Sequence, residues 1–241
     1  MATVIIDPGV ATSPNGSFEN ATNTFPANGW TVVNDATNKW FVGTFVYSAG
    51  AKGAYIGTAN TNNNYNKTTT QVSHFYRDVT FPSGENCITL TFKWQATGES
   101  CCDHLKVYLT TTGTTPTANT ELAVADLISS TLNQQGTWQT ATIVIPASNA
   151  GTTKRLVFSW RNDGSLGTNP AAAVDEISLT SSAITMTYAT LPYSESFESW
   201  TNSSACGSGS SDIPTANWLN SPNTGNNSWR RNDQGSTAVW S

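Results

Sequence analysis

The sequence predicts an all-β fold: an antiparallel jelly-roll β-sandwich followed by the start of a second, incomplete copy. Short runs of residues alternate between apolar and polar side chains, which is typical of strands that bury one face. Charged residues make up only 11% of the 241-residue chain, and Thr, Asn, Ser and Gly, which suit strands and turns, take their place. The second copy is indicated by a repeat, because Ser17-Phe18-Glu19 recurs as Ser196-Phe197-Glu198.

The clearest strands lie in the middle of the chain. Residues 86–97 and 105–109 alternate on either side of a turn at 98–102, which predicts a hairpin with one buried face. We expect about nine strands in all, and no segment has the 3.6-residue period of a helix. Segment 118–128 fits either a short strand or a helical turn. The other expected strands are 30–33, 39–42, 54–56, 71–81, 138–145, 155–161 and 174–180. Regularly spaced short strands of this kind are typical of a sandwich.

The repeat extends beyond its first three residues. Residues 25–30 are echoed by 213–218, and Asn38-Lys39-Trp40 is echoed by Asn227-Ser228-Trp229. The second copy stops before its hairpins, and a sheet that lacks most of its strands cannot bury its apolar face. We therefore expect the second copy to be disordered, or to rest on the first domain or on a partner. The predicted segments are a jelly-roll domain over 1–181, a linker over 182–191 and an incomplete second domain over 192–241.

Composition argues against two classes of partner. The formal net charge is −5 and the eleven basic residues are scattered, whereas nucleic-acid binding needs clustered Lys and Arg. No apolar run approaches the about 18 residues of a membrane-spanning helix. We therefore expect no nucleic-acid partner and no membrane insertion. Residues 1–10 show no signal peptide, although the composition suits an extracellular protein. We suppose that Met1 was added or that the chain is cut from a longer precursor.

Five short motifs together resemble the cleaved-adhesin domain. They are Ser17-Phe18-Glu19, Pro26-x-x-Gly29-Trp30, Asn38-x-Trp40, Gln135-Gly136-Thr137-Trp138 and Val174-Asp175-Glu176-Ile177. Such domains occur in the haemagglutinin/adhesin regions of gingipain-type proteases and in other surface proteins of Bacteroidota, and they are relatives of the MAM-like jelly rolls. The resemblance covers about residues 15–181, and residues 192–230 match the start of a second copy. It implies structural calcium, export by type IX secretion, a secreted, cell-surface location and adhesive binding.

Two pairs of acidic residues are candidate metal ligands. Glu19 is expected on the first short strand and Asp175 at the start of the last one, and in a jelly roll like the family's these strands lie close together. Two carboxylates there repel each other unless a cation lies between them, and calcium accepts carboxylates alongside backbone carbonyls. The alternative is that both are ordinary solvated acids. Glu99 and Asp103 flank the turn of the predicted hairpin, where they form a second ion site, an acidic rim for a ligand or merely a polar turn.

In the second copy, Glu198 matches Glu19, but no counterpart of Asp175 follows it, so we expect no complete calcium site there.

The four cysteines give no zinc signature. Cys101 and Cys102 are adjacent, without the two-residue spacer of zinc ribbons. Cys87 stands at the far end of its strand from this pair, too distant for a bridge to either. A vicinal Cys101–Cys102 disulfide is compatible with the sequence. Cys206 belongs to the second copy.

Several aromatic residues are candidate ligand-binding groups. Tyr47, Tyr55 and Tyr65 occur in loop-like sequence near the Asn-rich run 60–66, where exposed rings beside amides suit glycans. Trp40 is a further candidate. The alternative is a solvated polar loop. By contrast, Trp94 and Trp160 lie on the apolar faces of their strands and are expected in the core.

No catalytic motif is present: the sequence has no Gly-x-Ser-x-Gly elbow, no His-Glu-x-x-His and no phosphate loop. We therefore expect no enzyme. The sequence favours a non-catalytic, calcium-stabilised adhesin module of a secreted or cell-surface multidomain protein that binds a protein or glycan. Two alternatives remain: a carbohydrate-binding accessory module of a secreted enzyme, and a structural repeat of a surface fibre whose partners are neighbouring copies of the chain.

Overall fold

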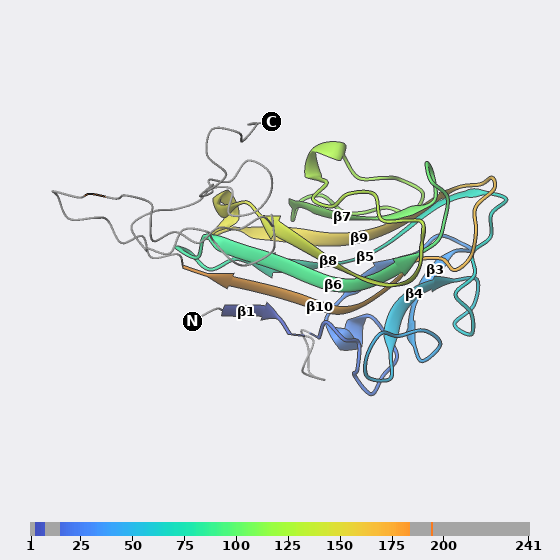
Figure 1. Ribbon diagram of the computed structural model, residues 1–241, viewed down its shortest axis with the longest axis horizontal. Helices are drawn as coiled ribbons and strands as arrows, with labels where there is room; N and C mark the ends of the chain where they lie inside the picture. The colour runs from blue at the N-terminus through green and yellow to red at the C-terminus, as the bar shows by residue number, and fades with distance from the viewer. Residues whose placement is uncertain (1–2, 8–14, 184–193, 195–241) are drawn as a thin grey trace, which may run out of the picture. The chain divides into compact units, whose positions relative to one another are not determined.

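The computed structural model describes residues 3–7, 15–183 and 194, and this part of the chain is a sandwich of two antiparallel sheets (Figure 1). The six-stranded sheet has the order β3-β4-β10-β6-β8, with β1 also beside β10, and the four-stranded sheet has the order β2-β5-β9-β7. The strands are β1 (Thr3–Ile6), β2 (Thr31–Val33), β3 (Lys39–Gly43), β4 (Gly53–Gly57), β5 (Thr70–Thr80), β6 (Cys87–Ala96), β7 (His104–Thr111), β8 (Gln135–Ile145), β9 (Thr153–Asp163) and β10 (Ala173–Ser182). The all-β sandwich predicted from the alternating pattern is confirmed.

Three short 3-10 turns connect these strands: η1 (Pro26–Asn28), η2 (Val124–Asp126) and η3 (Ala147–Asn149). The second of them lies within segment 118–128, where the sequence fitted a strand or a helical turn. None of the helical turns in the described part of the chain has the length and apolar character needed to cross a membrane. The predicted second copy over 192–241, including Glu198 and Cys206, lies outside the described residues apart from the exposed Ser194.

The predicted hairpin over 86–97 and 105–109 is wrong. Both segments are strands, but β6 pairs with β8 and β10 in one sheet, whereas β7 pairs with β9 in the other. The connection between them crosses from sheet to sheet, and its Gly98 pairs with the distant Thr168. The alternation of apolar and polar residues shows which face of a strand is buried. It does not show the pairing partner, because strands of two facing sheets alternate in the same way as the two strands of a hairpin.

The core is dominated by aromatic side chains that join the two sheets. Phe75 of β5 stacks on Phe158 of β9, with ring centroids 4.8 Å apart, and meets Trp40 of β3 edge-to-face at the same distance. The expected core residues Trp94 and Trp160 are buried, with 7% and 0% of their surface exposed. Buried rings in offset or edge-to-face contact add stability beyond the area they bury.

The motif that opens the sequence repeat is part of this core. Phe18 is fully buried and its ring lies 6.0 Å from Phe75 and 6.2 Å from Trp30. Its neighbour Gly16 lies directly against β10, because a Cβ atom there would stand 1.7 Å from the carbonyl oxygen of Ile177. Gly29 closes η1 with φ of 77°, a left-handed conformation that favours glycine. Phe18, together with Gly16 and Gly29, therefore marks where the N-terminal segment packs on the sandwich.

The outer face of the four-stranded sheet is covered by segment 112–134. Glu121 forms ion pairs with Arg161 at 2.6 Å and with Lys106 at 3.6 Å. Beneath this cover, His104 is 3% exposed, and neither of its ring nitrogens has a hydrogen-bond partner among the described residues. Burial lowers the pKa of His104 to about 4, with a further contribution from the positive charges of Lys106 and Arg161.

This buried histidine predicts a loss of stability in mild acid. The unfolded chain takes up a proton on His104 near pH 6.5, whereas the folded chain does so only near pH 4, so the free energy of unfolding falls as the pH drops between these values. We expect a contribution of roughly 1–2 kcal/mol between pH 7 and pH 5. Urea titrations of the wild type and of His104→Leu at several pH values measure it. The variant is expected to show the shallower pH dependence, and equal slopes would contradict this account.

Candidate functional site

Glu19 and Asp175 both hold the loop that joins β3 to β4. Asp175 is fully buried at the start of β10, and its Oδ2 accepts hydrogen bonds from the backbone N–H groups of Ser48 at 2.7 Å and Ala49 at 3.2 Å. Glu19 Oε1 accepts from the N–H groups of Ala51 and Lys52, both at 2.8 Å. The expectation that Glu19 lies on a strand is wrong, since it precedes η1 in an irregular segment. The two carboxylates nevertheless meet one short stretch of backbone.

A third carboxylate adds to the negative charge of this region. Burial raises the pKa of Asp175 to about 7, although three backbone N–H groups, the last from Glu176, act in the opposite direction. Burial also raises the pKa of Glu176, and the negative charge of Glu19 raises it further, while Lys93 opposes the rise. The loop approaches closely at Gly50, where an added Cβ would stand 2.3 Å from Glu19 Oε1. Glu19 and Asp175 thus bind one tightly packed loop, and Glu176 lies close enough to both for their charges to interact.

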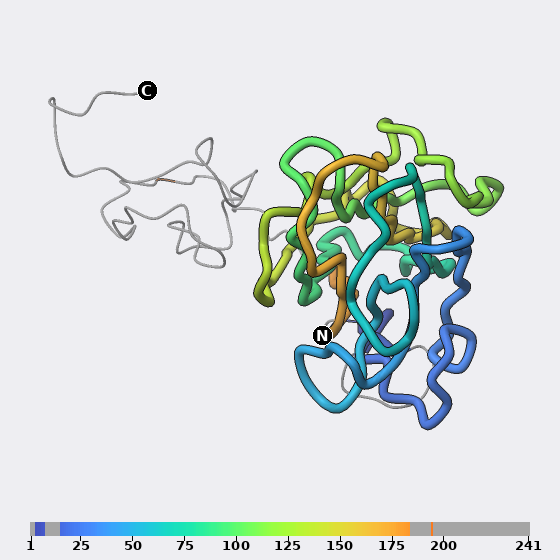
Figure 2. Tube along the Cα trace, turned by 90° about the vertical axis from the view of Figure 1, so that its right-hand side faces the viewer, coloured from blue at the N-terminus to red at the C-terminus, as the bar shows by residue number. Residues whose placement is uncertain are grey.

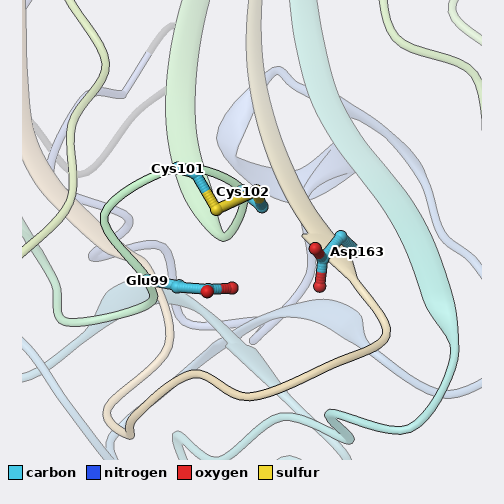
Figure 3. Close-up of side chains that lie close together, drawn as sticks. All are labelled: Glu99, Cys101, Cys102 and Asp163. Atoms are coloured by element: carbon cyan, nitrogen blue, oxygen red, sulfur yellow. A yellow bond between two sulfur atoms is a disulfide. The ribbon is translucent and has the colours of Figure 1, made fainter.

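A separate acidic group lies in the loops at one end of the sandwich. Glu99 and Asp163 face each other beside Cys101 and Cys102 (Figure 3), with one ligand atom from each of the four residues within 4.8 Å of the others. Cys101 and Cys102 form the vicinal disulfide that was compatible with the sequence, so neither offers a thiolate. Burial raises the pKa of Glu99, and the charges of Asp163 and then Asp103 raise it further. The chemistry left to this cluster is that of two neighbouring carboxylates.

The predicted pairing of Glu99 with Asp103 as exposed turn acids is wrong for Asp103. This residue is fully buried, and its Oδ2 accepts the hydroxyl hydrogen of Tyr65 at 2.5 Å while its Oδ1 accepts from the N–H of Asp163 at 2.9 Å. Burial and this hydrogen bond together raise the pKa of Tyr65. Asp103 therefore fastens the loops together and is not exposed on an acidic rim.

Three of the four predicted ligand-binding aromatics lie inside the protein. Trp40, Tyr55 and Tyr65 are 2%, 0% and 4% exposed, so none offers a free ring face, and their prediction as exposed platforms is wrong. Trp40 is drawn into the core by its apolar strand face, and its indole N–H donates to the carbonyl of Ser73. Tyr47 is 44% exposed, which fits its prediction as an accessible ring.

The sequence reasoning missed Phe45, whose ring is 53% exposed. It lies in the same β3–β4 loop and packs over Tyr55, with ring centroids 6.1 Å apart. Beside it is an open pocket of about 390 Å³ that is formed mainly by loop residues. The lining residues are Phe45, Val46, Asn63, Asn64, Gln95, Asn169 and Pro170. This lining combines one accessible aromatic ring with four amide side chains and no charge.

The amides are held by segments that are far apart in the sequence. Segment 163–172 (orange) runs beside segment 58–70 at this end of the molecule (Figure 2). Asn63 Nδ2 donates to the carbonyl of Ile56 at 2.8 Å, and its own backbone carbonyl accepts from the N–H of Ala171 at 2.9 Å. Asn169 Oδ1 accepts from the N–H of Tyr65 at 3.2 Å. The polar side of the pocket is therefore fixed by the folded backbone.

Comparison with known proteins identifies similar folds only. No protein-family model and no curated protein matches this chain. Among solved structures, the carbohydrate-binding module TmCBM61 in complex with β-1,4-galactotriose matches with 13% identity and a TM-score of 0.44, covering 70% of this chain and 96% of that one. The K1 cleaved adhesin domain of Lys-gingipain from Porphyromonas gingivalis W83 matches with 19% identity and a TM-score of 0.43, and the match covers 68% of this chain and 94% of that one. The xylan-binding CBM22-1 domain of Paenibacillus barcinonensis Xyn10C matches with 12% identity and a TM-score of 0.42, and the match covers 70% of this chain and 92% of that one.

Because Asp103 and Glu99 have different environments, we expect their amide substitutions to change the free energy of unfolding differently. Asp103→Asn places an amide against two fixed donors, and losing hydrogen bonds to a buried charged group is expected to lower the free energy of unfolding by about 1.5–3 kcal/mol. Glu99→Gln removes repulsion from Asp163 and is expected to leave stability unchanged or slightly raised. Urea denaturation in the presence of a chelator measures both variants. A larger loss for Glu99→Gln than for Asp103→Asn would refute these roles.

Proposed function

We propose that this chain is a non-catalytic adhesin module of a secreted or cell-surface protein, and that it holds a neutral glycan in the pocket beside Phe45. The observation that carries the proposal is a half-exposed aromatic ring next to a cluster of amide side chains in an uncharged hollow. The pocket lining contains no carboxylate and no histidine, so it has no group to serve as a general acid or base. Such a lining supports binding of a ligand without catalysis.

The chemistry of the lining matches that of a sugar. A pyranose ring has an apolar face of C–H groups, which packs on an aromatic ring, and a rim of hydroxyls that both donate and accept hydrogen bonds. Asn and Gln side chains also do both, through one carbonyl oxygen and one NH₂ group. Ligand sites of this kind pair apolar surface with a few fixed polar groups. Because the lining carries no charge, it favours neutral glycans over acidic ones.

The pocket is also formed before a ligand arrives. Tyr55 supports the ring of Phe45 from below, and its own hydroxyl donates to the carbonyl of Asn60 at 2.6 Å. The Asn63 side chain is held by the hydrogen bonds described above, and Gln95 extends from β6 within 3.5 Å of its oxygen. Groups that are already ordered lose less entropy on binding. The half-exposed Tyr47, two residues after Phe45, could extend the contact to a second sugar unit.

Removal of the Phe45 ring tests the site. The wild type is first screened on an array of neutral and acidic glycans, and a bound neutral glycan is then titrated by calorimetry. Phe45→Ala is expected to weaken binding at least about tenfold, equivalent to about 1.4 kcal/mol, with unchanged thermal stability. Val124→Ala removes a comparably exposed apolar side chain from η2, where 81% of the valine is accessible, and is expected to bind as the wild type does.

Two outcomes contradict different parts of the proposal. Equal affinity of Phe45→Ala and the wild type would show that the glycan binds elsewhere. Binding of acidic glycans alone, or of no glycan on the array, would refute the proposed function itself.

We also propose that calcium stabilises the module through Glu19 and Asp175. The support is that both carboxylates bind the backbone of one loop and that Glu176 interacts with the charge of each, so that burial and repulsion raise two of the three pKa values. Carboxylate oxygens are among the ligands that calcium takes. Bound calcium would offset the negative charge of these carboxylates. Glu19 and Asp175 would then hold the β3–β4 loop, which carries Phe45, in place.

Chelation tests the calcium proposal. A site saturated at 100 times its dissociation constant adds about 2.7 kcal/mol, so we expect EDTA to lower the melting temperature by about 5–10 °C in a chain of this size. Glu19→Gln is expected to abolish most of that response. Glu99→Gln, which alters the other acidic cluster, is the matched control and is expected to keep it. An EDTA-independent melting temperature in the wild type would exclude structural calcium.

A further inference from the structure

One side of the sandwich has an open sheet edge. Among the described residues, β8 pairs with β6 and with no other strand, so its second edge is free. The neighbouring edge of the four-stranded sheet is closed, because residues 127–132 run along β7. There Leu105 and Leu132 exchange backbone hydrogen bonds of 2.9 and 3.0 Å, and the N–H of Ile128 donates to the carbonyl of Val107 at 2.9 Å. The free edge is therefore confined to the six-stranded sheet on this side.

A groove of about 550 Å³ follows this free edge between β8 and residues 128–132. Trp94, Leu132 and Ile143 form part of its apolar lining, and Ser129, Gln139 and Thr142 are among the polar residues. Ile128, Ala141 and Ile143 are half-buried and pack against the core. The hydrophobic core thus reaches the surface beside unpaired backbone groups, with no charged residue in the lining.

β8 lacks most of the features that protect an edge strand: its pairing with β6 is irregular between Gln135 and Gln139, but the ladder is unbroken from Gln139 to Ile145. Its eleven residues, Gln135–Ile145, contain no charged residue and no proline, and the last six are Thr140-Ala141-Thr142-Ile143-Val144-Ile145. Val144 is 70% exposed. Natural edge strands usually carry lysine, proline, bulges or a covering segment, because a long uncharged edge pairs with another strand. Segment 127–132 protects β7 in this way, and no segment within the described part of the chain pairs with the free edge of β8.

We propose that β8 is an interface with a second copy of this chain, in which the two β8 strands pair antiparallel about a two-fold axis and continue the six-stranded sheet across both copies. Such a contact is self-complementary, because the same strand serves both partners. Antiparallel pairing sets uncharged, mostly β-branched side chains opposite one another, which stabilises a sheet. No like charges meet in it, which is why a second copy fits this edge.

Charge gives this interface a distinctive salt dependence. Each copy has a formal net charge of −5, so two copies repel at long range, and salt screens that repulsion. Pairing through an uncharged edge is therefore strengthened by salt. An association that depends on ion pairs is weakened by salt instead.

Sedimentation velocity of the full chain tests the proposal, over about 1–500 µM and at 50 and 500 mM NaCl. We expect a monomer–dimer equilibrium that shifts toward the dimer at higher salt. Hydrogen exchange at high concentration is expected to show added protection in β8 and not in β7. A non-reducing gel identifies covalent dimers formed through the exposed free Cys87, and these are excluded from the fit.

Thr142→Lys is the decisive variant, because it places a positive charge on the exposed face of β8 in both copies. We expect it to raise the dimer dissociation constant at least tenfold with an unchanged melting temperature. Val124→Lys adds the same charge to the exposed η2 and is expected to dimerise as the wild type does. A monomer at every concentration, a dimer unaffected by Thr142→Lys, or a dimer lost at high salt would each overturn the proposal.

Discussion

The contact of Phe75 with the rings around it is the interaction on which the rest of this fold depends. Its ring lies 4.8–6.0 Å from Phe18, Phe25, Trp30, Trp40 and Phe158. These side chains come from the N-terminal segment, from both sheets and from the turn that joins them, so one cluster fixes their relative positions. Burial of large aromatic side chains is a major source of core stability. Three of the residues that recur in the sequence repeat, Phe18, Trp30 and Trp40, belong to this cluster.

The strands were predictable from local pattern, but the sheets were not. Alternation located the strands that became β6, β7 and β9 because burial of one face leaves a period of two. It could not show that β6 and β7 lie in different sheets, since that depends on a crossing connection whose Gly98 pairs with Thr168 seventy residues later. Pairing partners are a non-local property, and a single sequence records only which side of each strand faces the core.

The candidate site was predictable only in part, because its contacts also join residues that are far apart in the sequence. Glu19 and Asp175 were singled out through the resemblance to the cleaved-adhesin domain, and the structure shows that both contact the loop between β3 and β4. Asp103 could not be separated from Glu99 in advance, because the difference is a hydrogen bond to Asp103 from Tyr65, 38 positions away. The sequence also could not show which aromatic ring is accessible. Tyr55 and Phe45 are both aromatic residues near a loop, and the fold of residues 44–47 over β4 decides which one is covered.

The loop between β3 and β4 is the physical link between the two proposed sites. Phe45 and Tyr47 extend from its first half, while Asp175 and Glu19 hold the backbone of Ser48, Ala49, Ala51 and Lys52 just beyond them. A cation that neutralises the acids would keep this loop in place and so reduce the entropy lost when a glycan orders Phe45. Such coupling is reciprocal, so a glycan that orders the loop would tighten the cation by the same factor. Two acids 156 positions apart in the sequence, Glu19 and Asp175, would thereby control the position of one exposed ring.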